Sequence, residues 1–399
     1  MTPGLQQVGL GYEGDLPIGW KIVPAKQVCT KITDGTHDTP IPTPVGQPFI
    51  TAINVKDGKI DFSKCLYVDE ETHNSIFKRC NPQRGDLTIV NIGAGVGDCG
   101  YVEVDFEFSL KNVALLKPDP QKLDSRFLLH LHQSRRERIS HTVKAGGAQP
   151  FLSLAELRRL PILLPNLPEQ RRIAEILSTW DRAIETVEAL IANAATQKKA
   201  LMQSLLIGKQ RLPGFSGAWT TEKLGNLCQI SKGEQLGRLT MIEDGTIPVI
   251  NGGIAASGYT DRANNSGGCI TISEGGNSCG FVSMMDRPFW CGGHCYALKD
   301  LAVDRSFLFA SLKHREAEIM TLRVGSGLPN IQKKALSGFE LNLPPRAEQE
   351  AIGLFADTQD SVIFGLQAQL TALREEKFAL MQQLLTGKRR VKVAEREDA

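Results

Sequence analysis

One stretch of the sequence occurs twice, and this duplication constrains the fold more than any other feature. Residues 164–211 align with residues 343–390 without a gap, at a constant offset of 179, and 19 of the 48 aligned positions are identical. Both copies begin Leu-Pro-x-x-x-Glu-Gln and end Leu-Leu-x-Gly-Lys. An internal repeat indicates a repeated structural unit, so we expect two related halves.

The repeat carries the heptad pattern of a coiled coil. Its seam positions alternate spacings of four and three, which is typical of long helices that pair along a narrow stripe. The predicted seam and partner-docking residues are Ile173, Leu177, Trp180, Ile184, Val187, Ile191, Leu201 and Leu205 in the first copy, and Ile352, Ile363, Leu366, Leu370, Leu373, Leu380 and Leu384 in the second. About 40 helical residues at 1.5 Å each form a rod of roughly 60 Å. A helix of that length with one apolar stripe needs a partner.

The simplest partner for each long helix is the other one. Each copy follows a globular segment, so a parallel pair would crowd both segments at one end, whereas an antiparallel pair places them at opposite ends about a pseudo-twofold axis. Lys198 and Lys377 occupy equivalent seam positions, where a charged residue costs stability but fixes register. The alternative is two separate helices, each packed on its own domain.

Composition bounds the class of protein. The 399 residues are enough for two cores, and 41% hydrophobic with 23% charged residues is typical of a globular protein. The net charge of +2 does not by itself indicate nucleic-acid binding, so any such surface must come from local clustering of Lys and Arg. Nine cysteines without a visible signal peptide or membrane span favour reduced thiols in a cytoplasmic protein.

The chain divides into five segments. Residues 1–15 are expected to form an N-terminal extension, 164–211 and 343–399 the two coiled-coil helices (the second with a basic tail), and 16–163 and 212–342 two globular domains. Within these domains, short apolar runs between Gly and Pro predict strands at 48–55, 86–92, 247–250 and 269–273, and helices are predicted near 124–139, 153–160 and 305–322. The predicted fold class is therefore α+β, with two mixed, β-rich globules separated by two long helices.

Several polar or glycine-rich motifs in the globular domains suggest binding. Asp34-Gly35-Thr36-His37 is either a plain Asp-Gly turn or a loop that presents Thr36 and His37 to DNA. The glycines at 93–97 follow an apolar strand, but strand-like sequence resumes after them, so a nucleotide-binding loop is disfavoured. Asn91 and these glycines could instead bring the backbone close to a phosphate, and residues 251–254 and 274–277 invite the same interpretation.

Motifs for metal binding and catalysis are missing. Cys291, His294 and Cys295 lack a second pair at zinc-finger spacing, so buried free thiols are favoured and no metal site is predicted. We find no amino-methyltransferase tetrapeptide, P-loop, zincin motif or nuclease motif on a strand. No catalytic residue is predicted.

Taken in order, these motifs resemble the specificity subunit of type I restriction–modification systems. The resemblance covers nearly everything after residue 15. It rests on Leu16-Pro17-x-Gly19-Trp20, the Asp34-Gly35-Thr36-His37-x-Thr39-Pro40 turn, Gly85-Asp86-Leu87, Arg211-Leu212-Pro213-Gly214-Phe215 and, above all, the doubled element that opens each long helix. Gln359 stands where the family's seam has an apolar residue, and the N-terminal extension is not part of the family pattern.

The resemblance implies a protein that recognises DNA and performs no chemistry itself. Two target-recognition domains would each read one half of a split, asymmetric double-stranded DNA target, and the helices would set the spacing and dock two modification (methyltransferase) subunits. Restriction subunits would join that core. S-adenosylmethionine, ATP and Mg²⁺ would reside on these partners, with no cofactor on this chain and no membrane contact.

Candidate DNA contacts are chosen from loop position and side-chain chemistry. They are Lys31, Thr36, His37 and Asn91 in the first domain, and Lys232, Asn251, Ser257 and Arg262 in the second. Two rival functions stay open at this point, a free-standing DNA adenine methyltransferase and a coiled-coil adaptor that joins two protein-binding modules.

Overall fold

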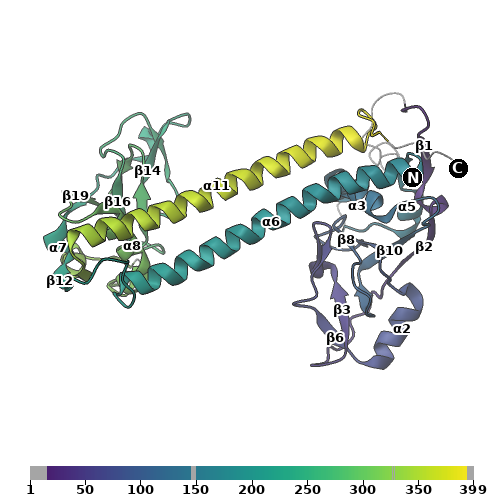
Figure 1. Cartoon of the computed structure of the whole chain (residues 1–399), viewed down its shortest axis with the longest axis horizontal. Helices are drawn as coiled ribbons and strands as arrows, with labels where there is room; N and C mark the ends of the chain where they lie inside the picture. Colours follow the sequence, from purple (N-terminus) through teal and green to yellow (C-terminus); the bar gives the residue numbers. More distant parts are fainter. Residues whose placement is uncertain (1–15, 145–149, 326, 328, 393–399) are drawn as a thin grey trace. The chain divides into compact units, whose positions relative to one another are not determined.

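A computed structural model of the chain describes residues 16–144, 150–325, 327 and 329–392 (Figure 1). The predicted N-terminal extension, the end of the basic tail and part of the Gly-rich segment before Pro150 lie outside these residues. The chain divides into two compact units, Met1–Thr186 with Leu370–Ala399, and Val187–Gln369. The division cuts through both long helices, so each unit holds one globular domain and a segment of each helix.

The globular domain of the first unit is built on a four-stranded antiparallel sheet in the order β2-β10-β7-β8. These strands are Cys29–Asp34, Val113–Pro118, Leu87–Val90 and Cys99–Tyr101. A second sheet orders β6 (Leu66–Val68), β3 (Gln47–Thr51) and β9 (Ser109–Lys111), and two strand pairs join β1 (Lys21–Pro24) to β11 (Pro161–Leu164) and β4 (Val55–Lys56) to β5 (Lys59–Ile60). The helices are α2 (Glu70–Cys80), α3 (Ser125–Gln133), α4 (Arg136–Lys144) and α5 (Leu154–Arg159).

Helix α3 shows how the sequence sets the packing of this domain. Asp124 caps it, because its carboxylate accepts a hydrogen bond from the Phe127 backbone N–H at 2.9 Å. Phe127, Leu128 and Leu131 are buried in the same core as Leu87 and Leu116 of the sheet. The apolar stripe of α3 thereby fixes the helix against the sheet.

The second unit repeats this topology. Its four-stranded sheet has the order β13-β19-β16-β17, and a three-stranded sheet has the order β15-β14-β18. The strands are β12 (Thr220–Lys223), β13 (Gln229–Lys232), β14 (Ile247–Ile250), β15 (Gly258–Thr260), β16 (Cys269–Ser273), β17 (Val282–Met285), β18 (Trp290–Cys291), β19 (Cys295–Lys299) and β20 (Glu340–Leu343). The helices are α7 (Leu224–Leu227), α8 (Arg305–His314), α9 (Glu316–Thr321) and α10 (Lys333–Ser337). Asp304 caps α8 as Asp124 caps α3, with the Phe307 N–H donating at 2.9 Å.

The two duplicated stretches form the long helices α6 (Leu167–Leu206) and α11 (Arg346–Leu384). In both units the two helices run side by side in opposite directions (Figure 1). In the first unit Ile173 and Leu177 share a buried cluster with Leu384, and in the second Ile352 shares one with Leu206. The predicted α+β fold with an internal repeat and an antiparallel helix pair is confirmed.

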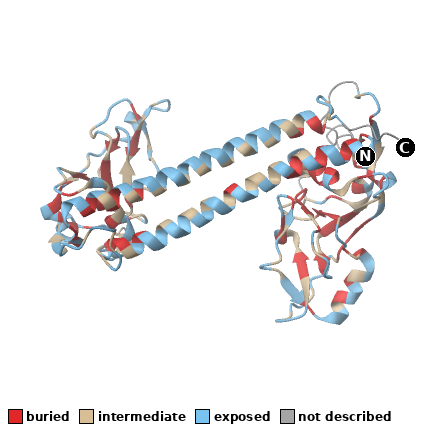
Figure 2. Cartoon of the chain, in the orientation of Figure 1, coloured by how far each residue is buried: buried red, intermediate tan, exposed pale blue. Residues whose placement is uncertain are grey.

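Burial along the helices follows the predicted heptads. Every predicted seam residue of α11 is buried or half-buried, as are those of α6 up to Ile191, whereas most positions between them are exposed (Figure 2). Leu201 is the exception. Its side chain is 37% exposed, and Met202, only 7% exposed, takes the inward position. At this end α6 also packs on the globular domain, where Met202 joins the core of Phe307 and Leu308, while the predicted seam residue Leu205 stays buried.

The Glu-Gln pair that opens each copy anchors the helix starts. Gln170 accepts a hydrogen bond from the Asp124 backbone N–H at 2.8 Å, and Gln349 accepts one from the Asp304 N–H at 3.1 Å. The glutamates Glu169 and Glu348 are nearly fully buried and pair with Arg390 and Arg211, which follow the end of the other long helix. The Gly after each helix, Gly208 or Gly387, has φ near +70°, a left-handed helix end that favours glycine.

Candidate nucleic-acid interface

The two domains share a backbone frame at one end of their four-stranded sheets. In both, the loop after the central strand β7 or β16 makes the same set of hydrogen bonds. In the first unit these bonds run from Gly93 N to Pro150 O, from Gly97 N to Val90 O and from Leu152 N to Asn91 O. The corresponding bonds of the second unit run, in the same order, from Gly276 N to Pro329 O, from Gly280 N to Ser273 O and from Ile331 N to Glu274 O. Asn91 and Glu274 therefore occupy equivalent positions.

Two further equivalences follow from the strand register. The bond from Gly35 N to Val113 O corresponds to the bond from Gly233 N to Cys295 O, each at the end of the outer strand. Asp34, which precedes Gly35, is thus equivalent to Lys232. The residues before Val113 and Cys295 are Asn112 and His294. Three equivalent positions carry Asp34, Asn91 and Asn112 in the first domain, and Lys232, Glu274 and His294 in the second.

In the first domain, three of the four predicted contact residues gather around Asp34. His37 lies between Asp34 Oδ2, 3.1 Å from its Nε2, and Asn112 Oδ1, 3.2 Å from its Nδ1. Lys31 donates to the Arg79 backbone carbonyl at 2.7 Å, and Arg79 itself pairs with Asp34. Lys31 and His37 are exposed, so they are available to a ligand.

Thr36 and Asn91 have different roles in this arrangement. The Thr36 hydroxyl accepts a hydrogen bond from the Asp38 backbone N–H at 3.1 Å, which closes the turn. Asn91 is fully buried, and neither of its side-chain polar atoms has a hydrogen-bond partner among the described residues. Direct contact of Asn91 with a duplex would require the surrounding loop to open, and its role stays a prediction.

In the second domain, Lys232 and Asn251 line one cavity of about 400 Å³ together with Glu274 and His294. Lys232 Nζ lies 2.5 Å from Glu274 Oε1, and His294 Nδ1 lies 3.6 Å from Glu274 Oε2. Asn251 Oδ1 accepts a hydrogen bond from the His294 backbone N–H at 3.1 Å and so shapes the wall. Burial and the nearby Glu274 carboxylate raise the pKa of Tyr296 to about 12, so its hydroxyl stays protonated and donates to the Ile331 carbonyl.

The other two predicted contacts of the second domain are not among the residues that line this cavity. Ser257 is exposed just before β15, and its backbone N–H donates to Val249 O at 2.8 Å. Arg262 is exposed after β15, near Asp261, with its guanidinium 5.8 Å from the centre of the Trp290 ring. Their contact with DNA stays a prediction.

Sequence reasoning did not select Glu274 or His294 as contacts. Glu274 stood out only through the glycines that follow it, and His294 only as a doubtful zinc ligand. The main-chain hydrogen bonds that the two domains share are what relates these residues to the first domain. They align Glu274 with Asn91 at an offset of 183 residues, whereas the two long helices align at an offset of 179.

Cys291 and Cys295 lie in a buried cluster with Cys269 and Phe289. Among the described residues, no group of three or more His, Cys, Asp or Glu side chains could hold a metal ion. Burial raises the pKa of the Cys269 thiol to about 11, so it is uncharged at neutral pH. The strand predicted after the first glycine loop is present as β8.

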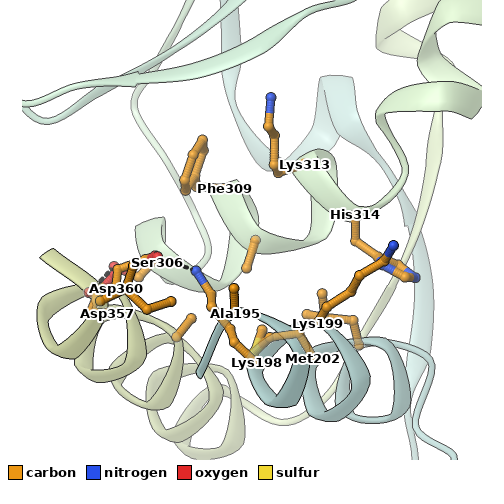
Figure 3. A pocket seen from close by; sticks show the side chains of 14 residues that line it. Ala195, Lys198, Lys199, Met202, Ser306, Phe309, Lys313, His314, Asp357 and Asp360 are labelled. Atoms are coloured by element: carbon orange, nitrogen blue, oxygen red, sulfur yellow. Dashed lines mark hydrogen bonds and ion pairs between the residues drawn. The ribbon is translucent and has the colours of Figure 1, made fainter. Parts of the chain in front are cut away.

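A second surface lies where α8 meets the long helices in the second unit. A cavity of about 380 Å³ is lined by α6, α8 and α11, with apolar walls from Met202, Phe309 and Ile363 (Figure 3). Lys198 pairs with Asp360, and the Ser306 hydroxyl donates to Asp357 at 2.6 Å (Figure 3).

One residue that lines this cavity differs in size from its counterpart in the first domain. The residue of α8 at the cavity is Ala310, whereas the equivalent residue of α3 is His130. The His130 ring is fully buried and lies 3.2 Å from the Ser178 hydroxyl of α6. Ala310 thus places a methyl group where the first domain has an imidazole against α6.

Comparison with known proteins identifies the class. The family described as the type I restriction modification DNA specificity domain matches residues 17–194 and 217–373, one match for each half. The chain belongs to this family.

Individual relatives are specificity subunits as well, and they cover from about a third to nearly all of this chain. The putative type I restriction enzyme MjaX specificity subunit of Methanocaldococcus jannaschii is 26% identical over 410 aligned residues, which cover 95% of this chain and 96% of that protein. A putative type I specificity subunit of Mycoplasma pneumoniae is 36% identical over 128 residues, covering 31% of this chain and 34% of that protein. The crystal structure of a type I restriction-modification S subunit from M. genitalium shares the fold with a TM-score of 0.66 at 18% identity, over 94% of this chain and 98% of that one.

Family membership confirms two predictions. The chain is a type I specificity subunit, and such subunits are non-catalytic, so it is not itself the enzyme. In the part of the chain that the structure describes, no helix combines the length and apolarity needed to cross a bilayer.

Proposed function

We propose that this chain is the DNA-reading subunit of a type I restriction–modification complex and that its domains read the two halves of a bipartite target. One observation supports this proposal: the two domains share the same main-chain hydrogen bonds but carry different side chains at equivalent positions. One fold, used twice, holds Asp34, Asn91 and Asn112 in one domain and Lys232, Glu274 and His294 in the other. Because equivalent places carry different donors and acceptors, the two domains present different chemistry to DNA, so the target is asymmetric.

The long helices supply the spacing between the two half-sites in this proposal. Each domain is anchored to its own helix segments, through Gln170 and Glu169 in the first unit and Gln349 and Glu348 in the second. One heptad inserted into each helix adds about 10 Å, close to three base pairs of DNA. We expect the spacer of the recognised target to lengthen accordingly. A complex that keeps the original spacer would show that the helices do not set it.

Partner subunits dock on the helices in this proposal. Both helices expose large apolar side chains outside the seam, and a partner that covered them would remove apolar surface from water. Leu354, Val362 and Phe364 of α11 are 69%, 49% and 73% exposed, and Leu190 of α6 is 47% exposed. We infer that two modification subunits cover these faces and that restriction subunits join them.

Co-purification tests the docking surface. Phe364→Ser should reduce capture of the modification subunit about tenfold or more, because interface anchors of this size contribute 1–2 kcal/mol or more. Leu239→Ser is the matched control, since Leu239 is fully exposed but lies in a short 3-10 turn of the second domain. Equal capture of both variants would place the partner elsewhere.

Cofactors and location follow from the same proposal. S-adenosylmethionine, ATP and Mg²⁺ would be held by the partners, in the cytoplasm where the DNA is. Sequencing of methylated bases in a host with and without this chain tests the whole proposal. A bipartite adenine mark should appear with the chain and vanish without it. A protein-binding adaptor would leave the methylation pattern unchanged.

A further inference from the structure

The cavity in the second domain places a donor and an acceptor side by side. Lys232, at the end of β13, and Glu274, just after β16, come from neighbouring parts of the sheet edge and pair at 2.5 Å. Their exposures differ. The Lys232 side chain is 52% exposed, whereas Glu274 is only 13% exposed. The ammonium group is thus free to swing toward a ligand while the carboxylate keeps its place.

The backbone holds Glu274 from both sides. Its N–H donates to the His294 carbonyl at 2.9 Å, and its carbonyl accepts from the Ile331 N–H at 2.8 Å and the Cys279 thiol at 2.9 Å. A residue clamped in this way presents its carboxylate in one direction, which preorganises it for recognition.

The Glu274 carboxylate retains acceptor capacity. Oε1 faces Lys232 and, at 3.4 Å, the Tyr296 hydroxyl. Within the described residues Oε2 accepts no hydrogen bond, and the His294 ring Nδ1 lies 3.6 Å from it. A carboxylate has about four lone-pair sites, so Oε2 can accept from a ligand N–H that enters the cavity.

These side chains are not required by the fold. The same backbone frame in the first domain carries Asp34 in place of Lys232 and Asn91 in place of Glu274. The sign of the charge reverses at one position and the charge is lost at the other, while the hydrogen bonds of the frame persist. The chemistry at these positions therefore serves recognition rather than packing.

We propose that Lys232 and Glu274 read a single G·C base pair from the major groove, a specificity that rests on the function proposed above. The edge of this pair presents O6 and N7 of guanine as acceptors next to the N4 amino group of cytosine as a donor. Lys232 donates to guanine, and Glu274 accepts from cytosine N4 through Oε2. The adjacent donor and acceptor of the protein match the adjacent acceptor and donor of the base pair.

Selection from a library of randomised duplexes tests this assignment. The full chain, purified with its modification subunits, should select a bipartite motif in which one half contains an invariant G·C pair. Glu274→Gln keeps the size of the side chain, and an amide pairs with adenine N6 and N7, so A·T should become accepted at that position alone. Lys232→Met should weaken the preference for G·C at the same position roughly 10- to 100-fold. Lys334→Met, an exposed lysine of α10, is the matched control and should leave the motif intact.

The outcomes separate this assignment from the function on which it rests. A wild-type complex that selects no motif would overturn the proposed function itself. Variants that select the wild-type motif would show that neither residue reads a base pair: uniformly weaker binding would mean that Lys232 contacts phosphate, and normal binding that it contacts no DNA. That result would overturn the base-pair assignment and leave the proposed function standing. Loss of all binding by both variants, with unchanged thermal unfolding, would overturn the assignment as well.

Discussion

Arg390 and Glu169 form a two-pronged ion pair although 221 residues separate them in the sequence. Arg390 Nε donates to Glu169 Oε1 at 2.6 Å and its Nη2 to Oε2 at 2.9 Å. The Glu169 side chain is 2% exposed, and the Trp20 indole N–H donates to it at 3.2 Å. Arg211 and Glu348 repeat the pair in the second unit. The Arg that follows each long helix thus neutralises the Glu that opens the other.

Removal of Arg390 should therefore destabilise the first unit. Arg390→Met leaves the buried Glu169 carboxylate without its cation, and we expect a loss of about 1–3 kcal/mol in unfolding free energy, measured by urea denaturation. Arg389→Met is the control, because Arg389 is an exposed neighbour. Equal losses in both variants would mean that the ion pair contributes nothing.

Each seam lysine forms an ion pair with an aspartate of the other long helix, and the charges of such a pair should be exchangeable. Lys377 forms an ion pair with Asp181 in the first unit, as Lys198 does with Asp360 in the second. Lys377→Glu places two carboxylates together at a half-buried seam and should cost about 1–3 kcal/mol. Addition of Asp181→Lys should recover at least half of that loss in a double-mutant cycle. If the losses simply add, the two residues do not interact.

Alanine substitution at two glycines of α11 should change the unfolding free energy in opposite directions. A Cβ on Gly353 would lie 2.4 Å from Asp304 Oδ1 and 3.0 Å from the Phe307 backbone nitrogen, the two atoms of the α8 cap. Gly353→Ala should therefore destabilise the second unit by about 1–3 kcal/mol. Nothing lies within 4 Å of a Cβ on Gly365, so Gly365→Ala should stabilise by up to about 1 kcal/mol through helix propensity. Thermal unfolding measures both effects: the unfolding temperature should fall for Gly353→Ala and rise for Gly365→Ala. A change in the same direction for both variants would contradict the packing described for α8.

The first unit should lose stability in mild acid because two histidines are buried in their neutral form. Burial lowers the pKa of His130 and of His132 to about 4, and for His130 the neighbouring Lys377 also lowers it while Asp181 opposes the shift. An unfolded histidine titrates near 6.5. Between about pH 6.5 and 4 the unfolded chain binds more protons, so stability falls as the pH falls, by up to roughly 3 kcal/mol per histidine.

The pH dependence of the unfolding free energy checks this prediction. His130→Gln should flatten the decline between pH 6.5 and 4, because it removes one of the two buried imidazoles. A wild-type protein with constant stability over that range would contradict neutral burial of both rings.

Much of the fold follows from the sequence because heptad spacing is a strong periodic signal. The seam positions of α11 match the prediction, as do the bounds of strands 247–250 and 269–273. The predicted helix at 305–322 is instead two helices, α8 and α9, because the chain breaks at Arg315. Leu201 was misplaced, because at this end α6 also packs on a globular domain through Met202, and periodicity does not report that contact.

The candidate site was less accessible to sequence reasoning. Lys232 and Asn251 were chosen for their chemistry, and the structure brings them to one cavity. Glu274 and His294 could not be matched to Asn91 and Asn112, since the side chains differ and the loops between the landmarks vary in length. Only main-chain hydrogen bonds reveal that correspondence.

The pairing of Glu169 with Arg390 also bears on how the chain matures. The residues that complete the first unit, from Leu370 onward, leave the ribosome only after the whole second unit has been made. A nascent chain that already contains the whole first domain still lacks Leu384, which packs in the cluster of Ile173 and Leu177, and the Arg390 cation that pairs with Glu169. A premature stop late in the message would therefore harm the domain that was made first.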